Sequence, residues 1–425
     1  MNDFVVPSNI IAAMKNYFSR WDTKEFLKRL EQSKFKLPRA SYPALAHIIG
    51  IILEKYVHWN YIYGIWALFD VYVSYDKYRA VREVDYNKLL RLLDQVYKDQ
   101  KTPVNAVANY PEKFIIELTH SCNLDCIMCG AGKYGYVREN TIDLTTFRRI
   151  CDTLLDDARV KIVRLNGIGE SLIIPNFEEY LNEIRNRQYR IEIFTNLHVP
   201  MRRIRRLIDL GARIYVSIDS PYPEKFEFIR RHGNFELFTR NLIKTTEYLK
   251  RSQSNTELIV NMTILDCNYT EIPSMIEYLA KCGVKNLLVT MVKEEFGSPW
   301  VLEKFDEICY YFKLAEKVAE KYGIEITLPN HLEGVPVKFY KSCVTSNTYC
   351  ECPWKEVVIR FNGDITACNM MNPFTYGNLF TDISVEHFLQ LWNGPNALLF
   401  RRVCNTAEKT WYCVNCYHYN PCIKP

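Results

Sequence analysis

Three cysteines close together in the chain are the residues whose type and spacing point most clearly to chemistry. Cys122, Cys126 and Cys129 form a C-x3-C-x2-C run directly after a predicted strand. Thiolates bind the irons of a [4Fe–4S] cube, and electron-transfer clusters are held by four of them. A set of three leaves one iron without a protein ligand. The spacing therefore predicts an iron–sulfur cluster that does chemistry at an open iron.

A second group of cysteines lies near the C-terminus. Cys352 and Cys368 flank Asn362-Gly363, a pair typical of a hairpin turn, which would bring the two thiols together. Cys413 and Cys416 follow as a C-x2-C pair and complete a set of four thiolates. Such a set suits either an iron–sulfur cluster or tetrahedral zinc, and the spacing alone does not distinguish the two.

The residues between these groups predict the elements that position them. From Phe114 to about Pro329, short β-branched runs alternate with amphipathic helical stretches such as Phe147–Leu155, Phe177–Arg187 and Ile272–Lys281. The six predicted strands are Phe114–Leu118, Lys161–Asn166, Arg190–Thr195, Arg213–Ile218, Leu258–Leu265 and Asn286–Val292. Six successive βα units imply an α/β fold with a parallel sheet, short of the eight units of a closed barrel. Ligands bind at the carboxyl ends of such strands, where the three cysteines lie.

We expect three domains: a helical region at 1–108, the α/β region at 109–329 and a cysteine-rich region at 330–425. Residues 1–108 have apolar positions at helical spacing without an alternating strand pattern. Their aromatic segment 44–73 predicts a helical hairpin, with a helix on a membrane surface as the alternative. Residues 330–425 hold eight of the fifteen cysteines and one clear helical stretch, Val385–Trp392.

Composition favours a cytoplasmic protein whose thiols bind metal. The start of the chain lacks the basic and apolar regions of a signal peptide, so a disulfide framework is not expected for the fifteen cysteines. No apolar stretch reaches the roughly 18–20 residues that span a bilayer. The net charge of +5 is mild and unclustered, which argues against a nucleic-acid partner. We interpret the basic run 202–206 as the solvated face of a helix. Cys151, Cys282 and Cys309 lie in helical patterns and are expected to pack as small apolar side chains.

The three-cysteine run resembles the motif of the radical S-adenosylmethionine (SAM) superfamily. The resemblance implies an open partial (β/α)6 TIM barrel in which the fourth iron chelates the amino and carboxylate groups of SAM. Reductive cleavage then gives a 5′-deoxyadenosyl radical that removes a hydrogen atom from a substrate. Agreement among several strand-end motifs supports the resemblance. The SAM-binding residues that it implies are Met128, Gly167, Gly169, Glu170, Thr195, Asn196, Ser217, Asp219 and Arg230.

Each of these assignments follows from a position in the family pattern. Glu170 in Gly-Ile-Gly-Glu would pair with the SAM ammonium, although Ile168 departs from the usual glycine. Ser217 and Asp219 would meet the ribose, and the Arg230 guanidinium would bind the carboxylate. Met128 would pack on the adenine, with ordinary core packing as the alternative. Thr195 and Asn196 end the third strand beside the site.

The C-terminal cysteines are similar to those of the SPASM/Twitch extension of this superfamily, which carries auxiliary [4Fe–4S] clusters. Cys352, Cys368, Cys413 and Cys416 fit the shorter Twitch form, with one cluster. The seven-cysteine pattern would also use Cys422, and Cys343 or Cys350 upstream. Its last two cysteines are missing from the sequence, so one auxiliary cluster is expected.

The resemblance predicts an enzyme that oxidises its substrate radical through the auxiliary cluster. The substrate would be a peptide under maturation or a sugar or cyclitol alcohol, and a flavodoxin or ferredoxin would supply electrons. Glu294 could act as the base and Cys267 as the hydrogen donor of an epimerase. A lipid-linked substrate is a further alternative, and an iron–sulfur carrier protein is the non-enzymatic one.

Overall fold

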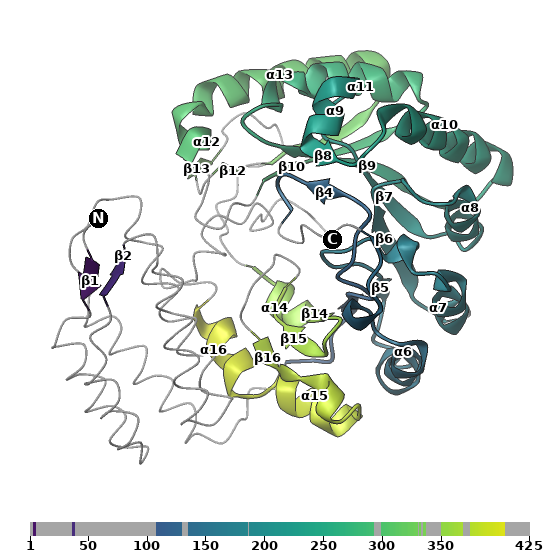
Figure 1. The fold of residues 1–425 in the computed structure, drawn as a ribbon, viewed down its shortest axis with the longest axis vertical. Helices are drawn as coiled ribbons and strands as arrows, with labels where there is room; N and C mark the ends of the chain where they lie inside the picture. The colour runs from purple at the N-terminus through teal and green to yellow at the C-terminus, as the bar shows by residue number, and fades with distance from the viewer. Residues whose placement is uncertain are drawn as a thin grey trace.

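The computed structural model describes ten stretches of the chain, drawn in colour in Figure 1. They are residues 3–5, 36–38, 108–129, 135–185, 187–292, 299–329, 331–332, 335–336, 350–368 and 375–403. Most of the expected N-terminal helical domain therefore lies outside the described residues. Within it, β1 (Asp3–Val5) and β2 (Lys36–Pro38) pair as antiparallel strands, which the helical expectation did not include.

A curved ten-stranded sheet organises the described part of the chain. Its strand order is β11-β10-β9-β7-β6-β5-β3-β14-β15-β16. The strands are β3 (Lys113–Ile116), β5 (Ile162–Arg164), β6 (Arg190–Thr195), β7 (Arg213–Ser217), β9 (Leu258–Ile264), β10 (Asn286–Met291), β11 (Glu325–Thr327), β14 (Glu356–Ile359), β15 (Asp364–Thr366) and β16 (Thr375–Asn378). All neighbours from β11 to β14 pair in parallel, and only the last two pairings are antiparallel.

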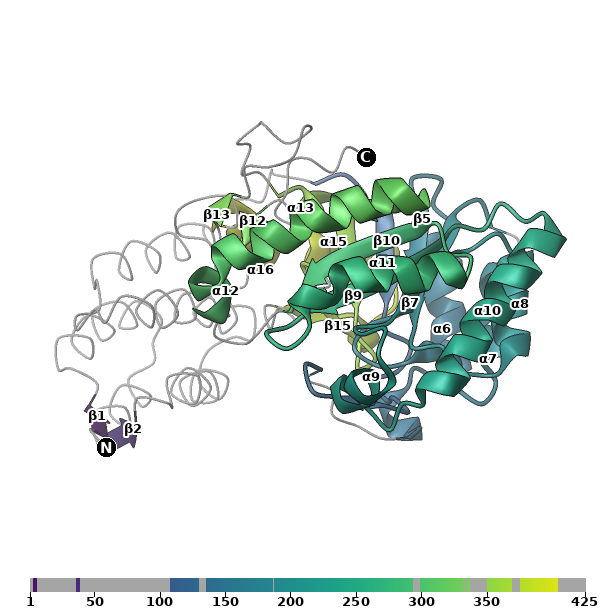
Figure 2. The ribbon, with the colours of Figure 1, turned by 90° about the horizontal axis from the view of Figure 1, so that it is seen from above.

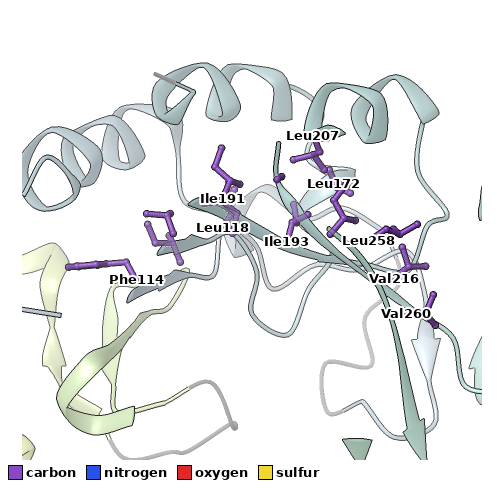
Figure 3. Close-up of a cluster of buried hydrophobic side chains, with 14 of the residues drawn as sticks. Phe114, Leu118, Leu172, Ile191, Ile193, Leu207, Val216, Leu258 and Val260 are labelled. Atoms are coloured by element: carbon purple, nitrogen blue, oxygen red, sulfur yellow. The ribbon is translucent and has the colours of Figure 1, made fainter. Parts of the chain in front are cut away.

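Helices follow the strands and cover one side of this sheet (Figures 1 and 2). They are α6 (Leu144–Ile150), α7 (Phe177–Ile184), α8 (Met201–Asp209), α9 (Pro223–Ile229), α10 (Phe235–Ser252), α11 (Ile272–Lys281), α12 (Pro299–Glu303) and α13 (Phe305–Tyr322). Apolar side chains fill the layer between the helices and the sheet, as Figure 3 shows for Leu118, Ile191, Ile193 and Leu207. Cys151, Cys282 and Cys309 are buried in the same core, as predicted. The fold is the predicted open barrel, and the six predicted strands are its β3, β5, β6, β7, β9 and β10.

The C-terminal region joins the same sheet. The predicted hairpin forms from β14 and β15, and Gly363 in its turn has a φ of +89°, which favours glycine. β14 then pairs in parallel with β3, so that Ile359 lies opposite Ile116. The helices α14 (Cys352–Lys355), α15 (Val385–Trp392) and α16 (Pro395–Val403) flank this hairpin. Trp392 donates a hydrogen bond to the carbonyl of Asn109, 3.0 Å away, which ties α15 to the chain just before β3.

The prediction that the basic run 202–206 is a solvated face holds for Arg202 and Arg205, which are exposed, but is wrong for Arg203. Arg203, in α8, is 4% exposed instead of solvated. Its guanidinium donates to the carbonyl oxygens of Leu172 and Pro175 and contacts Glu178. Three oxygens offset the cost of burying the charge, a compensation that helical spacing alone does not reveal.

Two further short antiparallel strand pairs lie outside the main sheet. β4 (Asp125–Cys126) pairs with β8 (Arg230–Arg231), and β12 (His331–Leu332) pairs with β13 (Val335–Pro336). Among the described residues, no helix is both long and apolar enough to cross a membrane.

Candidate cluster and S-adenosylmethionine site

The three-cysteine loop is fixed to the barrel by a short strand pair. β4 places Cys126 opposite Arg230 of β8, and the amide of Ile127 donates to the carbonyl of Ile229 at 2.9 Å. Cys126 is buried, whereas Cys122 and Cys129 are half-buried. The loop follows β3, so the thiols lie at the carboxyl end of the parallel strands, as predicted.

Hydrogen-bond donors face two of these thiols. The amide of Leu124 lies 3.4 Å from the Cys122 sulfur, and the Asn196 side-chain nitrogen lies 3.8 Å from it. Arg230 Nη1 lies 3.9 Å from the Cys126 sulfur. Donors of this kind stabilise thiolates that bind iron and tune the potential of a cluster. The surroundings of the thiols therefore fit an iron–sulfur cluster.

Without metal, burial favours the protonated form of Cys122 and Cys126 by raising the pKa of both thiols. Burial raises the pKa of Cys122 to about 12, and the charge of Glu170 adds to the effect. Metal binding deprotonates such thiols. No three His, Cys, Asp or Glu side chains in the described part of the chain form a single-ion site. A [4Fe–4S] cube instead distributes its thiolates over several irons, so this spacing is compatible with a cube.

Glu170 lies in a tight loop after β5 and is 3% exposed. One carboxylate oxygen accepts from the amide of Asn196 at 2.7 Å, and the other accepts from the amide of Leu172 at 3.3 Å. Burial raises the pKa of Glu170 to about 7, although these hydrogen bonds oppose it. Glu170 forms no ion pair with the described residues, so its buried carboxylate is suited to bind a ligand ammonium.

The two glycines of this loop allow close backbone approach. A Cβ on Gly169 would lie 2.4 Å from the carbonyl oxygen of Thr119 and 2.5 Å from that of Ser121. A Cβ on Gly167 would lie 2.4 Å from the side chain of Glu117. The loop is therefore packed directly against the residues that lead into Cys122.

Glu117 is a residue that sequence analysis did not single out. It is fully buried just after β3, and its Oε1 accepts from the amide of Ile168 at 2.9 Å and from His120 at 3.3 Å. Its Oε2 accepts from the amide of Phe361 at 3.4 Å and lies 3.8 Å from Arg360. Burial raises the pKa of Glu117, but the hydrogen bonds and the arginine outweigh it, so the pKa lies below its ordinary value. The sequence feature that could have identified Glu117 is its position as a carboxylate inside the apolar run 114–118.

Asp219 and Arg230 form a buried ion pair beside the cysteine loop. Arg230 Nη2 lies 2.8 Å from Asp219 Oδ2, and both side chains are almost completely excluded from solvent. Asp219 Oδ1 accepts from the amide of Thr263 at 2.8 Å. The expected ribose contact of Asp219 stays a prediction, whereas its observed contacts fix the position of Arg230.

The polar residues that end β6 form a network of their own. Asn196 donates to Asn123 at 2.7 Å, and its carbonyl lies 2.9 Å from His198 Nδ1. Thr195 accepts from the amide of Leu197, a residue with φ of +62°. Asn123 and His198, which sequence analysis did not name, thus position Asn196 close to Cys122.

The remaining predicted site residues lie in different parts of the structure, and one lies outside the described residues. Met128 packs against a small apolar cluster of Ile229, at the end of α9, and Leu265 and Val292, which directly follow β9 and β10. Ser217 is half-buried at the end of β7. Cys267 is exposed after β9, where partial burial raises the pKa of its thiol and its carbonyl accepts from Lys225 at 2.9 Å. Glu294 lies outside the described residues.

The C-terminal cysteines are described in part. Cys352 begins α14, and a hydrogen bond with Cys350, together with burial, raises the pKa of Cys352 well above its ordinary value. Cys368 follows β15. Cys413 and Cys416 lie outside the described residues, so the four-thiolate set stays a prediction.

Comparison with known proteins agrees with these sites. The model of the radical SAM superfamily matches residues 116–279, which include the three cysteines and the Glu170 loop. The model of an iron–sulfur cluster-binding domain, SPASM, matches residues 350–417. The cofactors of the protein are therefore SAM and a [4Fe–4S] cluster, with further iron–sulfur binding at the C-terminal domain.

Curated relatives align with this chain at low identity. The tungsten-containing aldehyde ferredoxin oxidoreductase cofactor-modifying protein of Pyrococcus furiosus is 24% identical over 307 residues, covering 67% of this chain and 82% of the relative. The antilisterial bacteriocin subtilosin biosynthesis protein AlbA of Bacillus subtilis is 25% identical over 319 residues, covering 71% of this chain and 66% of AlbA.

Solved structures share the fold. SuiB of Streptococcus suis bound to SAM superimposes with a TM-score of 0.55 at 16% identity, covering 80% of this chain and 79% of SuiB. Native anSMEcpe with bound AdoMet gives a TM-score of 0.53 at 16% identity, covering 72% and 88% of the two chains. The chain belongs to the radical SAM superfamily and is an enzyme with a C-terminal SPASM domain.

Proposed function

We propose that this enzyme modifies a peptide by removing a hydrogen atom from one of its carbons, and that the C-terminal cluster accepts an electron from the substrate. The observation that carries the proposal is the Glu170 carboxylate, buried close to Cys122 with both oxygens held by backbone amides. An electron carrier needs no such group beside its cluster. SAM bound at a reduced three-cysteine cluster supplies the means to break an unactivated C–H bond.

The residues of the chain hold SAM by charge and shape. Glu170 binds the ammonium, because two backbone amides hold its buried carboxylate in place. Arg230 binds the carboxylate, and Asp219 keeps the guanidinium in place through the 2.8 Å ion pair. A planar guanidinium binds a carboxylate through two parallel hydrogen bonds. Met128 and its apolar neighbours exclude water from the same end of the barrel.

Similar proteins support a peptide as the substrate class. AlbA is named for the biosynthesis of a bacteriocin, and SuiB has been solved with its precursor peptide SuiA at a TM-score of 0.54. anSMEcpe has been solved with bound AdoMet and the Cp18Cys peptide. A peptide is an extended ligand and needs a longer contact surface than SAM. Residues outside the barrel would supply part of that surface.

The test measures 5′-deoxyadenosine released from SAM under anaerobic reduction with dithionite. A filtrate of small molecules and peptides from the source cells is divided, and one half is digested with a broad protease that is then removed. We expect the undigested half to stimulate release above the uncoupled rate and the digested half not to do so. Equal stimulation by both halves would refute a peptide and favour a sugar or cyclitol alcohol. A Cys126→Ala variant, which cannot hold the first cluster, should release no product.

A further inference from the structure

The carboxylate of Glu117 joins three parts of the molecule that lie far apart in the sequence. Its Oε1 holds the amide of Ile168 in the loop that carries Glu170, and it also holds His120, just before the cysteine run. Its Oε2 faces the amide of Phe361 and the guanidinium of Arg360, in the hairpin turn of the SPASM domain. One buried side chain therefore contacts the SAM loop, the cluster loop and the C-terminal domain.

Neighbouring atoms also pack closely around the Glu117 side chain. Gly167 leaves the space that Glu117 fills, since a Cβ there would lie within 2.4–2.6 Å of three side-chain atoms of Glu117. On the opposite side, the Glu117 amide donates to the carbonyl of Ile359 at 2.9 Å and continues the β3–β14 pairing. The His120 ring lies 5.2 Å from the ring of Phe361.

We propose that Glu117 is a positioning residue through which the SPASM domain sets the geometry of the SAM-binding loop. The inference rests on the proposed role of Glu170 in binding the SAM ammonium. Its consequence is that SAM affinity depends on Arg360, although Arg360 lies outside the loop and belongs to another domain.

The energetics of a buried charge explain why a carboxylate can act in this way. A buried carboxylate is tolerated only if hydrogen bonds and opposite charges offset its lost solvation. Glu117 obtains these from all three segments at once, and charge-assisted hydrogen bonds are about twice as strong as neutral ones. Removing a donor on the SPASM side leaves the buried negative charge of Glu117 with fewer stabilising contacts. The position of the carboxylate is then less tightly fixed. The Ile168 amide, bound to the same group, is then held less firmly.

The experiment compares equilibrium binding of radiolabelled SAM to the anaerobically reconstituted, oxidised full-length enzyme, in which no turnover occurs. Glu117→Gln keeps the size of the side chain but loses its charge and one acceptor oxygen. Arg360→Met removes the cation from the SPASM side alone. We expect SAM to bind about tenfold more weakly to Glu117→Gln, the range for losing a hydrogen bond to a charged group. Arg360→Met should weaken binding about threefold, as expected for losing a partly exposed ion pair whose atoms lie 3.8 Å apart.

Glu192→Gln is the matched control. Glu192 is 1% exposed in β6 and pairs with Arg164 at 2.6 Å, Arg213 at 3.0 Å and Lys113 at 3.1 Å. Among the described residues, none of these ion-pair partners lies in the SAM loop. This variant also removes a buried charge, so it reports the effect of general destabilisation. We expect it to bind SAM as the wild type does. Iron content and the thermal midpoint are measured for every variant.

Each outcome has a distinct meaning. Wild-type affinity in both Glu117→Gln and Arg360→Met would overturn the inference, as would an equal loss of affinity in Glu192→Gln. Failure of the wild type itself to bind SAM would instead refute the proposed function. If Glu117→Gln does not assemble its clusters, Arg360→Met decides the matter: weakened SAM binding at normal iron content supports the inference, and unchanged binding overturns it.

Discussion

Replacing Asp219 by asparagine should destabilise the barrel strongly, because it leaves a buried cation without its counterion. Asparagine has nearly the same shape and still accepts from the amide of Thr263, so the lost charge is the main change. Among the described residues, the Arg230 guanidinium would keep the Cys126 sulfur, 3.9 Å away, and its Nε already has no hydrogen-bond partner there. Breaking a buried ion pair by removing one partner costs about 3–5 kcal/mol.

The assay is urea unfolding of the reconstituted enzyme, followed by tryptophan fluorescence. Asp219→Asn should lower the unfolding free energy by about 3–5 kcal/mol. Arg230→Met combined with Asp219→Asn should cost less than the two single changes added together, because the double variant buries no unpaired charge. Asp266→Asn is the control, since Asp266 pairs with Lys304 at 2.5 Å in an exposed site, where such pairs contribute little. A loss in Asp219→Asn no larger than in Asp266→Asn, or strictly additive variants, would refute the reasoning.

Four further outcomes are expected. Neighbouring cations hold the pKa of Glu192 at about 2 despite its burial, so relative to Glu192→Gln the wild type should gain about 3 kcal/mol of stability near neutral pH. That advantage should be lost as the pH falls from about 5 to about 2, and a pH-independent difference in urea unfolding would contradict it. Cys126→Ser should lose about four irons per chain by iron and sulfide analysis, whereas Cys151→Ser in the core should keep them. Gly169→Ala should reduce SAM binding at least tenfold in dialysis, because its Cβ meets two fixed carbonyl oxygens, and near-normal affinity would show that the loop adapts. Cys267→Ala should leave the modified product unchanged by mass spectrometry if the reaction is an oxidation, and abolish it if that thiol returns a hydrogen atom.

The sequence was informative where chemistry or periodicity is local. The six strands of the barrel were predicted because each is a short apolar run between helical stretches, and α11 and α15 coincide with the predicted ranges. The three cysteines needed no tertiary information, since their spacing within one loop defines the motif. Gly167, Gly169 and Glu170 were found for the same reason, as consecutive members of one turn.

Long-range contacts account for what the sequence did not reveal. The role of Glu117 depends on Arg360 and Phe361, which reach it only because β14 pairs with β3. The burial of Arg203 likewise depends on carbonyl groups of a different loop. Patterns of charge along one segment cannot predict either contact, because the compensating groups come from elsewhere in the fold.

The pairing of β14 with β3 also bears on how the chain is made. β3 is the first strand of the barrel to be synthesised, yet the partner for one of its edges is complete only when residue 359 has been added. At about 5–20 residues per second, the ribosome needs roughly 12–50 seconds to cover that interval. Throughout this time the nascent chain carries an open, apolar strand edge of the kind that recruits other strands. The SPASM domain would therefore act as a late closing step in biogenesis, and truncation before residue 356 should yield a barrel prone to aggregation.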